Sequence, residues 1–206
     1  NPTGTIYRRK PWERFLDRIS PEVLVIVDEA YFEYVSDPDY PESLAYHGKE
    51  KFILTLRTFS KLYGLAGLRV GYGIGSQEIV DLMHRVRQPF NVNAAAQWAA
   101  LAALEDREHV RRTLEVNRDG MEYLTREISR LGLEHIPSLA NFILLRVGDG
   151  QAVFQQLLRC GVIVRPMGGY DFPEHIRVTV GTMEENRKFI EELQAITKPF
   201  SRSVEA

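Results

Sequence analysis

Cysteine is almost absent from this sequence, which has Cys160 alone among its 206 residues. A single thiol cannot form an internal disulfide, and we expect Cys160, which lies among apolar residues, to be a reduced structural thiol. No apolar run approaches the roughly 18 residues that a membrane helix needs. No basic leader precedes an apolar core either, so we expect a soluble, cytoplasmic protein that has no membrane partner.

An excess of charge of one sign is also missing, since 26 Lys and Arg residues stand against 28 Asp and Glu residues. The formal net charge of -2 gives no global basic field, so we expect no nucleic acid partner. A hydrophobic share of 44% is enough for a sizeable core. We therefore expect small molecules or another copy of the chain as partners, and no metal site.

Three strand signals occur in the first half of the chain. The run VLVIVDEA, which begins at Val23, is rich in β-branched residues and ends in two acids, as is typical of a buried parallel strand with Asp28 at its C-terminal edge. A second signal spans residues 52–57 and runs into TFSK, and a third, LRVGYGIG, begins at Leu68. We expect the three strands to share one sheet.

Helical patterns follow these strands. Ser76 is predicted to cap a helix over SQEIVDLMHRVRQ, and an alanine-rich helix from about Asn93 to Leu104 is predicted to be buried, because it is apolar on most of its circumference. The charged stretch 107–131 has apolar residues near helical spacing and is predicted to connect two lobes, with Gly132 ending it.

The last third of the sequence predicts a smaller α/β lobe. Its strands are ANFILLRV, VIVRPM and HIRVTVG, and its helices are 151–159 and TMEENRKFIEELQAI, the latter capped by Thr182. The final residues, SRSVEA, are predicted to form a loose tail. At the other end, the chain begins at Asn1 without a methionine and opens on the turn signal NPTG, so we expect a piece of a longer protein.

Two motifs at predicted strand ends carry candidate chemistry. DEAY follows the first strand, and TFSK, which ends in Lys61, follows the second. A lysine amine attacks a carbonyl only in its neutral form, so Lys61 is a candidate nucleophile if its surroundings favour that form. Taken alone, TFSK is more typical of a solvated surface lysine, and DEAY is more typical of a strand end that makes ordinary polar contacts.

In order and spacing together, six motifs resemble the fold type I pyridoxal 5'-phosphate (PLP) aminotransferases, and the segment GVIVRPMGGYDFPEHIRVTVG resembles their histidinol-phosphate branch. The motifs are NPTG (1–4), DEAY (28–31), TFSK (58–61), GLAGLRVGY (64–72), ANF (140–142) and RVTVG (177–181). The resemblance covers nearly the whole chain. It implies part of a PLP-binding large domain with a mostly parallel sheet in residues 1–106, then a connecting helix and a small C-terminal domain in residues 107–206.

The resemblance also implies roles around the cofactor ring. Lys61 would form a Schiff base with PLP and then move a proton between the substrate carbon and the cofactor carbon. Asp28 would face the pyridine nitrogen and keep it protonated, which makes the ring a better electron sink. Tyr31 and Asn1 would hydrogen-bond the phenolic oxygen of the cofactor.

Two anionic groups would need separate binding residues. Thr58 and Arg69, joined by Ser60, would bind the phosphate of the cofactor. Arg177 would hold the carboxylate of the substrate, with Asn141 as a helper, because its planar fork suits bidentate contacts.

Arg165 would bind the phosphate of a phosphorylated substrate in the histidinol-phosphate branch. Without the family resemblance, Arg177 is more typical of a strand arginine in a surface ion pair. The alternative for Arg165 is an ion pair with Asp171 or Glu174.

The implied activity is transfer of an amino group between L-histidinol phosphate and 2-oxoglutarate, in histidine biosynthesis, by a homodimer. A different amino acid aminotransferase and a PLP-dependent decarboxylase of a phosphorylated amino acid would use the same motifs. A ligand-sensing domain like those of certain transcription regulators is a non-enzymatic alternative. Earlier family elements, including an aromatic residue that stacks on the pyridine ring, have no counterpart in this sequence, so we expect uncovered sheet edges and apolar faces.

Overall fold

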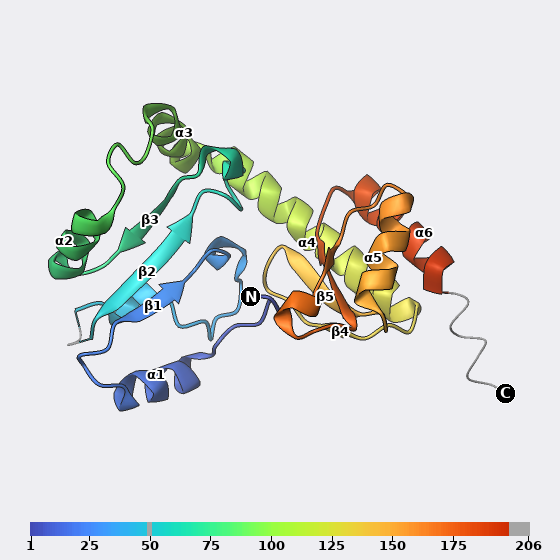
Figure 1. Cartoon of the computed structure of the whole chain (residues 1–206), viewed down its shortest axis with the longest axis horizontal. Helices are drawn as coiled ribbons and strands as arrows, with labels where there is room; N and C mark the ends of the chain where they lie inside the picture. Colours follow the sequence, from blue (N-terminus) through green and yellow to red (C-terminus); the bar gives the residue numbers. More distant parts are fainter. Residues whose placement is uncertain (49–50, 198–206) are drawn as a thin grey trace. The chain divides into compact units, whose positions relative to one another are not determined.

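The computed structural model describes residues 1–48 and 51–197, and the predicted SRSVEA tail lies outside them. The chain forms two compact units (Figure 1). The first is Ile6–Arg111, and the second joins Asn1–Thr5 to the residues from Arg112 onward. Both units combine helices with a sheet, so the predicted α/β class is confirmed. The division into domains at residue 106 stays a prediction.

The first unit has one three-stranded sheet in the order β1-β2-β3, as the sequence predicted. β1 (Val25–Asp28) runs parallel to β2 (Ile53–Thr58), and β3 (Gly71–Ile74) runs antiparallel to β2. The parallel pair is the one that matters for the site, because both strands end at the same edge of the sheet. Three short 3-10 helices lie in the connecting segments, at Phe32–Tyr34, Ser43–Tyr46 and Ala66–Leu68.

Helix α1 (Arg9–Arg18) of this unit was not predicted. Its sequence is strongly charged, but Trp12 and Leu16 are four residues apart and therefore share one face of the helix. Both are buried against Val25 of β1 and Ile53 of β2. The burial of these two residues holds this short helix against the sheet, although most of its other positions are charged.

The predicted helices α2 (Gln77–Val86) and α3 (Ala94–Glu105) are present. The side chain of Ser76 accepts a hydrogen bond from the Ile79 amide at 3.4 Å, which confirms the predicted cap. The predicted burial of α3 is wrong. Its small residues pack against the core, but Trp98 is 71% exposed. An apolar helix needs neighbours on every side to be buried, and the described part of this unit supplies them on one side.

The second unit has a four-stranded antiparallel sheet in the order β4-β5-β7-β6. Its strands are β4 (His135–Ile136), β5 (Phe142–Arg146), β6 (Arg165–Pro166) and β7 (His175–Thr179), and its helices are α4 (Arg107–Arg130), α5 (Gly150–Arg159) and α6 (Met183–Thr197). The division between the two units falls within α4. Helix α4 forms in the charged stretch that was predicted to be helical, and the two-residue β4 was not predicted.

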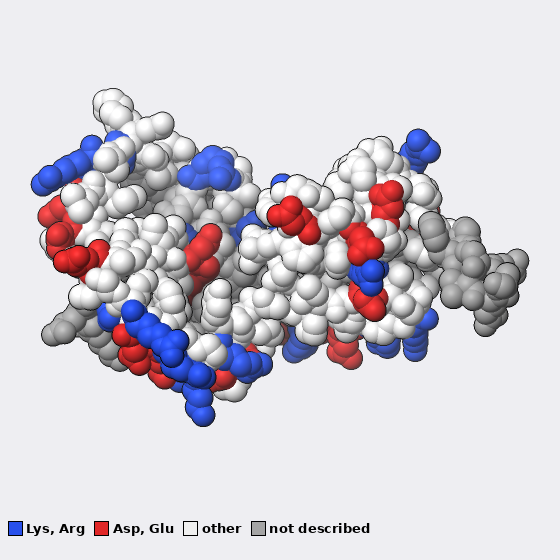
Figure 2. All heavy atoms as spheres, turned by 60° about the horizontal axis from the view of Figure 1, so that its bottom comes forward, with Lys and Arg blue, Asp and Glu red and all other residues white. Residues whose placement is uncertain are grey.

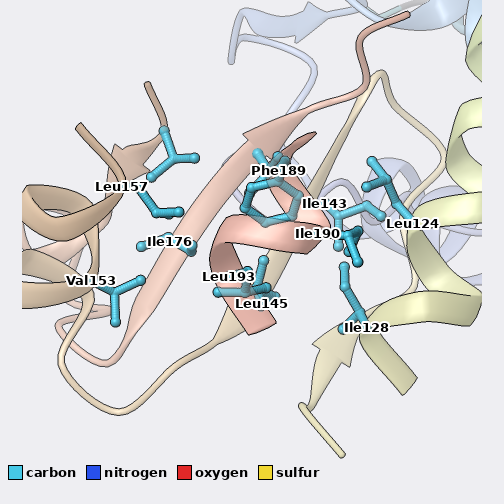
Figure 3. Packing of buried hydrophobic residues seen from close by; sticks show 12 residues of the cluster. Leu124, Ile128, Ile143, Leu145, Val153, Leu157, Ile176, Phe189, Ile190 and Leu193 are labelled. Atoms are coloured by element: carbon cyan, nitrogen blue, oxygen red, sulfur yellow. The ribbon is translucent and has the colours of Figure 1, made fainter. Parts of the chain in front are cut away.

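The core of this unit lies between one face of the sheet and the three helices (Figure 3). Side chains alternate between the two faces of a strand, so Ile143 and Leu145 of β5 lie on the same face of the sheet. Their partners on β7 are Val178 and Ile176. The helices cover these residues with apolar side chains that include Leu124, Ile128, Val153, Leu157, Phe189, Ile190 and Leu193. The opposite face of the same strands carries Arg177 and Thr179 of β7 beside Phe142 and Leu144 of β5, which are also buried.

The surface mixes charges of both signs. On the face shown in Figure 2, basic and acidic side chains occur beside one another, and neither sign dominates. Within residues 1–48 and 51–197, every helix lacks the length or the apolar character needed to cross a bilayer. The described part of the chain also has no cluster of three or more His, Cys, Asp or Glu side chains that could hold a metal ion.

The N-terminus of α6 is held by a reciprocal cap. Glu185 Oε2 accepts hydrogen bonds from the Thr182 amide at 2.7 Å and from its hydroxyl at 2.9 Å, and the Glu185 amide donates to Thr182 Oγ1 at 3.3 Å. Such a capping box satisfies donors that the first helical turn leaves unpaired. The Thr182 amide, followed by the Thr182 hydroxyl, lowers the pKa of Glu185.

Replacing Glu185 by Ala should therefore lower the free energy of unfolding by about 1 kcal/mol at neutral pH, as measured by urea denaturation. Glu184→Ala removes the neighbouring carboxylate of the same first turn, which makes no capping bond, and should cost less. Because the folded pKa of Glu185 is depressed, its contribution is present above the unfolded pKa of about 4.3 and is lost as the pH falls through the folded value. A difference that persisted unchanged in stronger acid would contradict this account.

Candidate active site

The strand ends of β1 and β2 bring the first candidate residues to one edge of the sheet. Asp28 is the last residue of β1 and pairs with Leu56, and Thr58, two residues further on, is the last residue of β2. The Asp28 side chain is exposed, and its Oδ1 accepts one hydrogen bond, from the Ala30 amide at 3.1 Å. That bond fixes the carboxylate at the strand end and leaves acceptor capacity for a ligand.

Lys61 lies beside the segment that follows β1. Its Nζ is 5.3 Å from the centroid of the Tyr31 ring, within the range of a cation-π contact. The DEAY and TFSK motifs, which are 30 residues apart between their first positions, therefore meet in space. Among the described residues, Lys61 forms no ion pair, so its amine is not committed to a carboxylate. The sequence had predicted that these two motifs act together, and this contact brings them together.

The end of β2 and the loop between β2 and β3 carry the three residues that were predicted to bind the phosphate of the cofactor. Thr58 pairs with Gly71 across the two strands, and the Phe59 amide donates to the Val70 carbonyl at 3.2 Å, so the loop is closed at its base. Thr58 Oγ1 accepts from the Ser60 amide at 3.1 Å.

Arg69 stands at the other end of this loop. It adopts a left-handed backbone conformation with φ 55°, its Nη1 donates to the Ala66 carbonyl at 2.7 Å, and it is exposed. Thr58, Ser60 and Arg69 thus belong to one closed loop, where a neutral hydroxyl, a second hydroxyl and a guanidinium form a donor set suited to an anion.

Buried apolar residues anchor the loop on both sides of Lys61. Phe59 is 4% exposed and Leu62 is 1% exposed. Phe59 and Val70 pack against Ala96 and Ala100 of α3. Because its neighbours in the chain are fixed in the core, the lysine is presented from a rigid base rather than from a mobile loop, as a precise site requires.

Two further residues of this region, Glu29 and Arg57, were not predicted from the sequence. The Glu29 side chain is fully buried, and Arg57 Nη2 lies 2.9 Å from its Oε2. Burial by itself would lower the pKa of Arg57. The hydrogen bond to Glu29 and the negative charge of Glu29 outweigh this effect, so the net shift of the Arg57 pKa is upward. Local sequence gives no sign of such a pair, since its members are 28 residues apart.

A second group of candidate residues lies in the other unit. Arg165 of β6 and Arg177 of β7 are direct cross-strand partners, and therefore lie on the same face of the sheet. Arg177 Nη1 donates to Asn1 Oδ1 at 2.7 Å, and its guanidinium carbon is 4.7 Å from the centroid of the Phe142 ring. This is the face opposite the apolar core, so strand alternation separates the two arginines from the helices.

The ion pairs considered for Arg165 are not formed. Glu174 pairs instead with Arg146 at 3.1 Å, and Arg165 makes no ion pair with any described residue. Its guanidinium carbon lies 5.5 Å from the centroid of the Tyr170 ring. Asn141, predicted as a helper of Arg177, accepts a hydrogen bond from the Val180 amide through its backbone carbonyl at 2.9 Å. The predicted residues thus fall into two groups, one in each unit, with Asn1 in the group of Arg177.

The sequence matches the family Aminotransferase class I and II over residues 1–193. The chain belongs to this family. Among curated relatives, this aminotransferase chain is similar to histidinol-phosphate aminotransferase 1 of Nitrosococcus oceani, with 51% identity over 201 residues, which cover 97% of this chain and 54% of the relative. For the histidinol-phosphate aminotransferase of Akkermansia muciniphila, the identity is 48% over 196 residues, which cover 95% of this chain and 53% of the relative.

The fold agrees with that of solved aminotransferases. A crystal structure of histidinol-phosphate aminotransferase from Sinorhizobium meliloti in complex with pyridoxal-5'-phosphate superposes with a TM-score of 0.88 and 24% identity, covering 97% of this chain and 56% of that chain. The predicted fold relationship to the PLP aminotransferases is therefore confirmed. The chain spans about half the length of the curated relatives it matches.

Replacing Leu62 by Ala would test the rigid base of the lysine loop in this aminotransferase. Leu62 is 1% exposed, so we expect the free energy of unfolding to fall by about 2 to 5 kcal/mol in urea denaturation. Leu158→Ala removes the same atoms at a position that is 41% exposed and should change stability by less than about 0.5 kcal/mol. Equal effects of the two substitutions would show that Leu62 is not an anchor.

Proposed function

We propose that the full-length protein is a PLP-dependent transaminase that transfers an amino group between L-histidinol phosphate and 2-oxoglutarate, in histidine biosynthesis. The observation that carries this proposal is the 5.3 Å contact between Lys61 Nζ and the Tyr31 ring, which places an uncommitted lysine beside the strand end that bears Asp28. The histidinol-phosphate aminotransferases with 43–51% identity support the choice of substrate.

The residues of the first unit fit PLP in number and in kind. PLP has an aldehyde, a basic ring nitrogen and a phosphate, and this unit offers an amine, a carboxylate and a hydroxyl–guanidinium set. When bound, PLP would supply the electron sink that allows a carbon–hydrogen bond of the amino substrate to break. The solved relative that contains pyridoxal-5'-phosphate has the same fold.

Each residue near the ring would have a separate task. Lys61 would hold the cofactor through its amine and, once the substrate amine has displaced it, would accept the proton from the substrate carbon and deliver it to the cofactor carbon. Asp28 would keep the pyridine nitrogen protonated through a charged hydrogen bond. Tyr31 would donate its hydroxyl to the phenolic oxygen, together with Asn1. Lys61 can perform both proton transfers because the substrate carbon and the cofactor carbon would lie on either side of one nitrogen, within reach of a single amine on a rigid loop.

The β2–β3 loop would bind the phosphate of the cofactor. Thr58 and Ser60 would donate neutral hydrogen bonds, and Arg69 would supply the opposite charge. Since Lys61 lies in the same closed loop, binding of the phosphate and binding of the aldehyde are coupled through a short stretch of backbone. A loop anchored in the core would keep the two contacts at a constant separation.

The arginine face of the second unit would select the substrates. Arg165 would bind the phosphate of L-histidinol phosphate, and Arg177, aided by Asn141, would hold the carboxylate of 2-oxoglutarate or glutamate. The hydrogen bond from Arg177 to Asn1 Oδ1 would orient the guanidinium before substrate arrives. Two arginines that are cross-strand partners suit a pair of substrates that are both anionic but carry different anionic groups.

The setting of the enzyme is also part of the proposal. We propose that residues 1–106 belong to the PLP-binding domain and residues 107–206 to the connecting helix and small domain. We further propose that the enzyme acts as a cytoplasmic homodimer. Its partners would be an amino donor and a 2-oxo acid, without nucleic acid or membrane.

Replacing Lys61 by Ala in the full-length protein should abolish the absorbance band near about 420 nm that forms when PLP is added. The amine is the group that would bind the aldehyde, and alanine cannot replace it. Lys10→Ala, which removes an exposed amine on α1, is the matched control and should leave the band intact. A Lys61→Ala protein that kept both the band and full turnover would rule out the proposed site.

Replacing Arg165 by Met should raise the KM for L-histidinol phosphate by about tenfold or more, because a charged hydrogen bond to the phosphate is lost. The KM for 2-oxoglutarate should change much less, whereas Arg177→Met should affect 2-oxoglutarate strongly. Steady-state assays of glutamate formation measure both values. Release of carbon dioxide from a phosphorylated amino acid, with no glutamate formed from L-histidinol phosphate and 2-oxoglutarate, would favour the decarboxylase. Turnover of other amino acids alone would overturn the choice of substrate.

A further inference from the structure

Glu29 and Arg57 form a buried ion pair in the unit that contains the lysine loop. The exposed fraction of the side chain is 0% for Glu29 and 11% for Arg57. Arg57 Nε donates to Glu29 Oε2 at 2.9 Å, and Nη2 lies at the same distance from this oxygen. The other oxygen, Oε1, accepts from the Ser43 amide at 3.1 Å and from the Tyr40 hydroxyl at 3.3 Å. Contacts on both oxygens hold the carboxylate in one place.

Each member of this pair adjoins a candidate cofactor residue. Glu29 follows Asp28, and Arg57 precedes Thr58. Successive residues of a strand point to opposite faces of a sheet, so the pair lies across the sheet from the side chains of Asp28 and Thr58. The Glu29 amide also donates to the Leu56 carbonyl at 2.9 Å, which extends the β1–β2 ladder by one residue. Backbone and side chain together therefore join the two strand ends.

The guanidinium of Arg57 also contacts the segment that carries Tyr31. Its carbon lies 3.7 Å from the centroid of the Phe32 ring, and Phe32 directly follows Tyr31. One arginine thus touches the ends of β1, through Glu29, and the turn after β1, through Phe32. A buried charge with two such contacts cannot shift without losing one of them, and removal of its partner would leave it unpaired.

We propose that Glu29 and Arg57 are positioning residues that fix the spacing between Asp28 at the end of β1 and the Thr58–Lys61 segment at the end of β2. This inference rests on the proposed PLP site. The ring nitrogen, aldehyde and phosphate of PLP are attached to one rigid ring, so Asp28, Lys61 and Thr58 can engage it together at one spacing of the strand ends. The ion pair sets that spacing from the face that the cofactor does not touch.

Glu29→Gln in the full-length protein is the first test, because it removes the charge but keeps the shape. We expect the dissociation constant of PLP, from absorbance titration, to rise by about tenfold or more, as when a group that orients a ligand-binding residue is lost. The pH midpoint of the cofactor absorbance band should also shift, because Asp28 would no longer be held in place. Glu42→Gln is the matched control, since Glu42 Oε1 is 3.8 Å from the same Arg57 Nη2 but its side chain is 55% exposed. It should leave the dissociation constant of PLP within about twofold of the wild-type value and the pH midpoint unshifted.

A double variant separates positioning from mere stability. Glu29→Leu with Arg57→Met removes the pair without leaving a buried unpaired charge, and such replacements often preserve or increase stability. We expect its thermal unfolding midpoint without PLP to be near that of the wild type, while its dissociation constant for PLP remains raised. Wild-type PLP binding and an unshifted pH midpoint in Glu29→Gln would overturn the positioning role alone. A wild-type protein that forms no PLP band would overturn the proposed function and this inference together.

Discussion

The parallel pairing of β1 with β2 is the constraint on which the candidate cofactor site depends. In a parallel pair both chains leave the sheet at the same edge, so residues that follow the two strands meet although they are far apart in sequence. Here the ladder aligns Asp28 with Leu56, and the contact of Lys61 with Tyr31 follows from it. A slip of one residue would turn the Asp28 side chain to the other face of the sheet, because side chains alternate along a strand.

The second unit uses the same alternation for a different purpose. On β7, Ile176 and Val178 face the helices and form the core, while Arg177 between them faces the other way. Its cross-strand partner on β6 is Arg165, so two cations share the face opposite the helices. The packing that stabilises the unit thus also determines where the arginines point, and no separate structural element is needed to present them.

Patterns within short windows allowed most of the strands and helices to be predicted, including the Ser76 cap and the strand-end positions of Asp28 and Lys61. Four features were beyond such patterns. Helix α1 has two buried residues among charged ones, and the exposure of α3 depends on which neighbours cover it. Glu29–Arg57 and Asn1–Arg177 join residues 28 and 176 positions apart, and each looks like an ordinary polar residue in its own segment. Only tertiary structure brings such partners together.

The two groups of candidate residues differ in how strongly the fold constrains them. Glu29 accepts from several donors and is fully buried, so a change there disturbs the core as well as the strand ends. Arg165 is exposed and makes no ion pair with the described residues, so its replacement leaves no buried group unsatisfied. Substitutions at exposed positions usually change stability by less than about 0.5 kcal/mol. It follows that the arginine face can change with little cost in stability, whereas a change in the buried ion pair behind the strand ends costs stability as well.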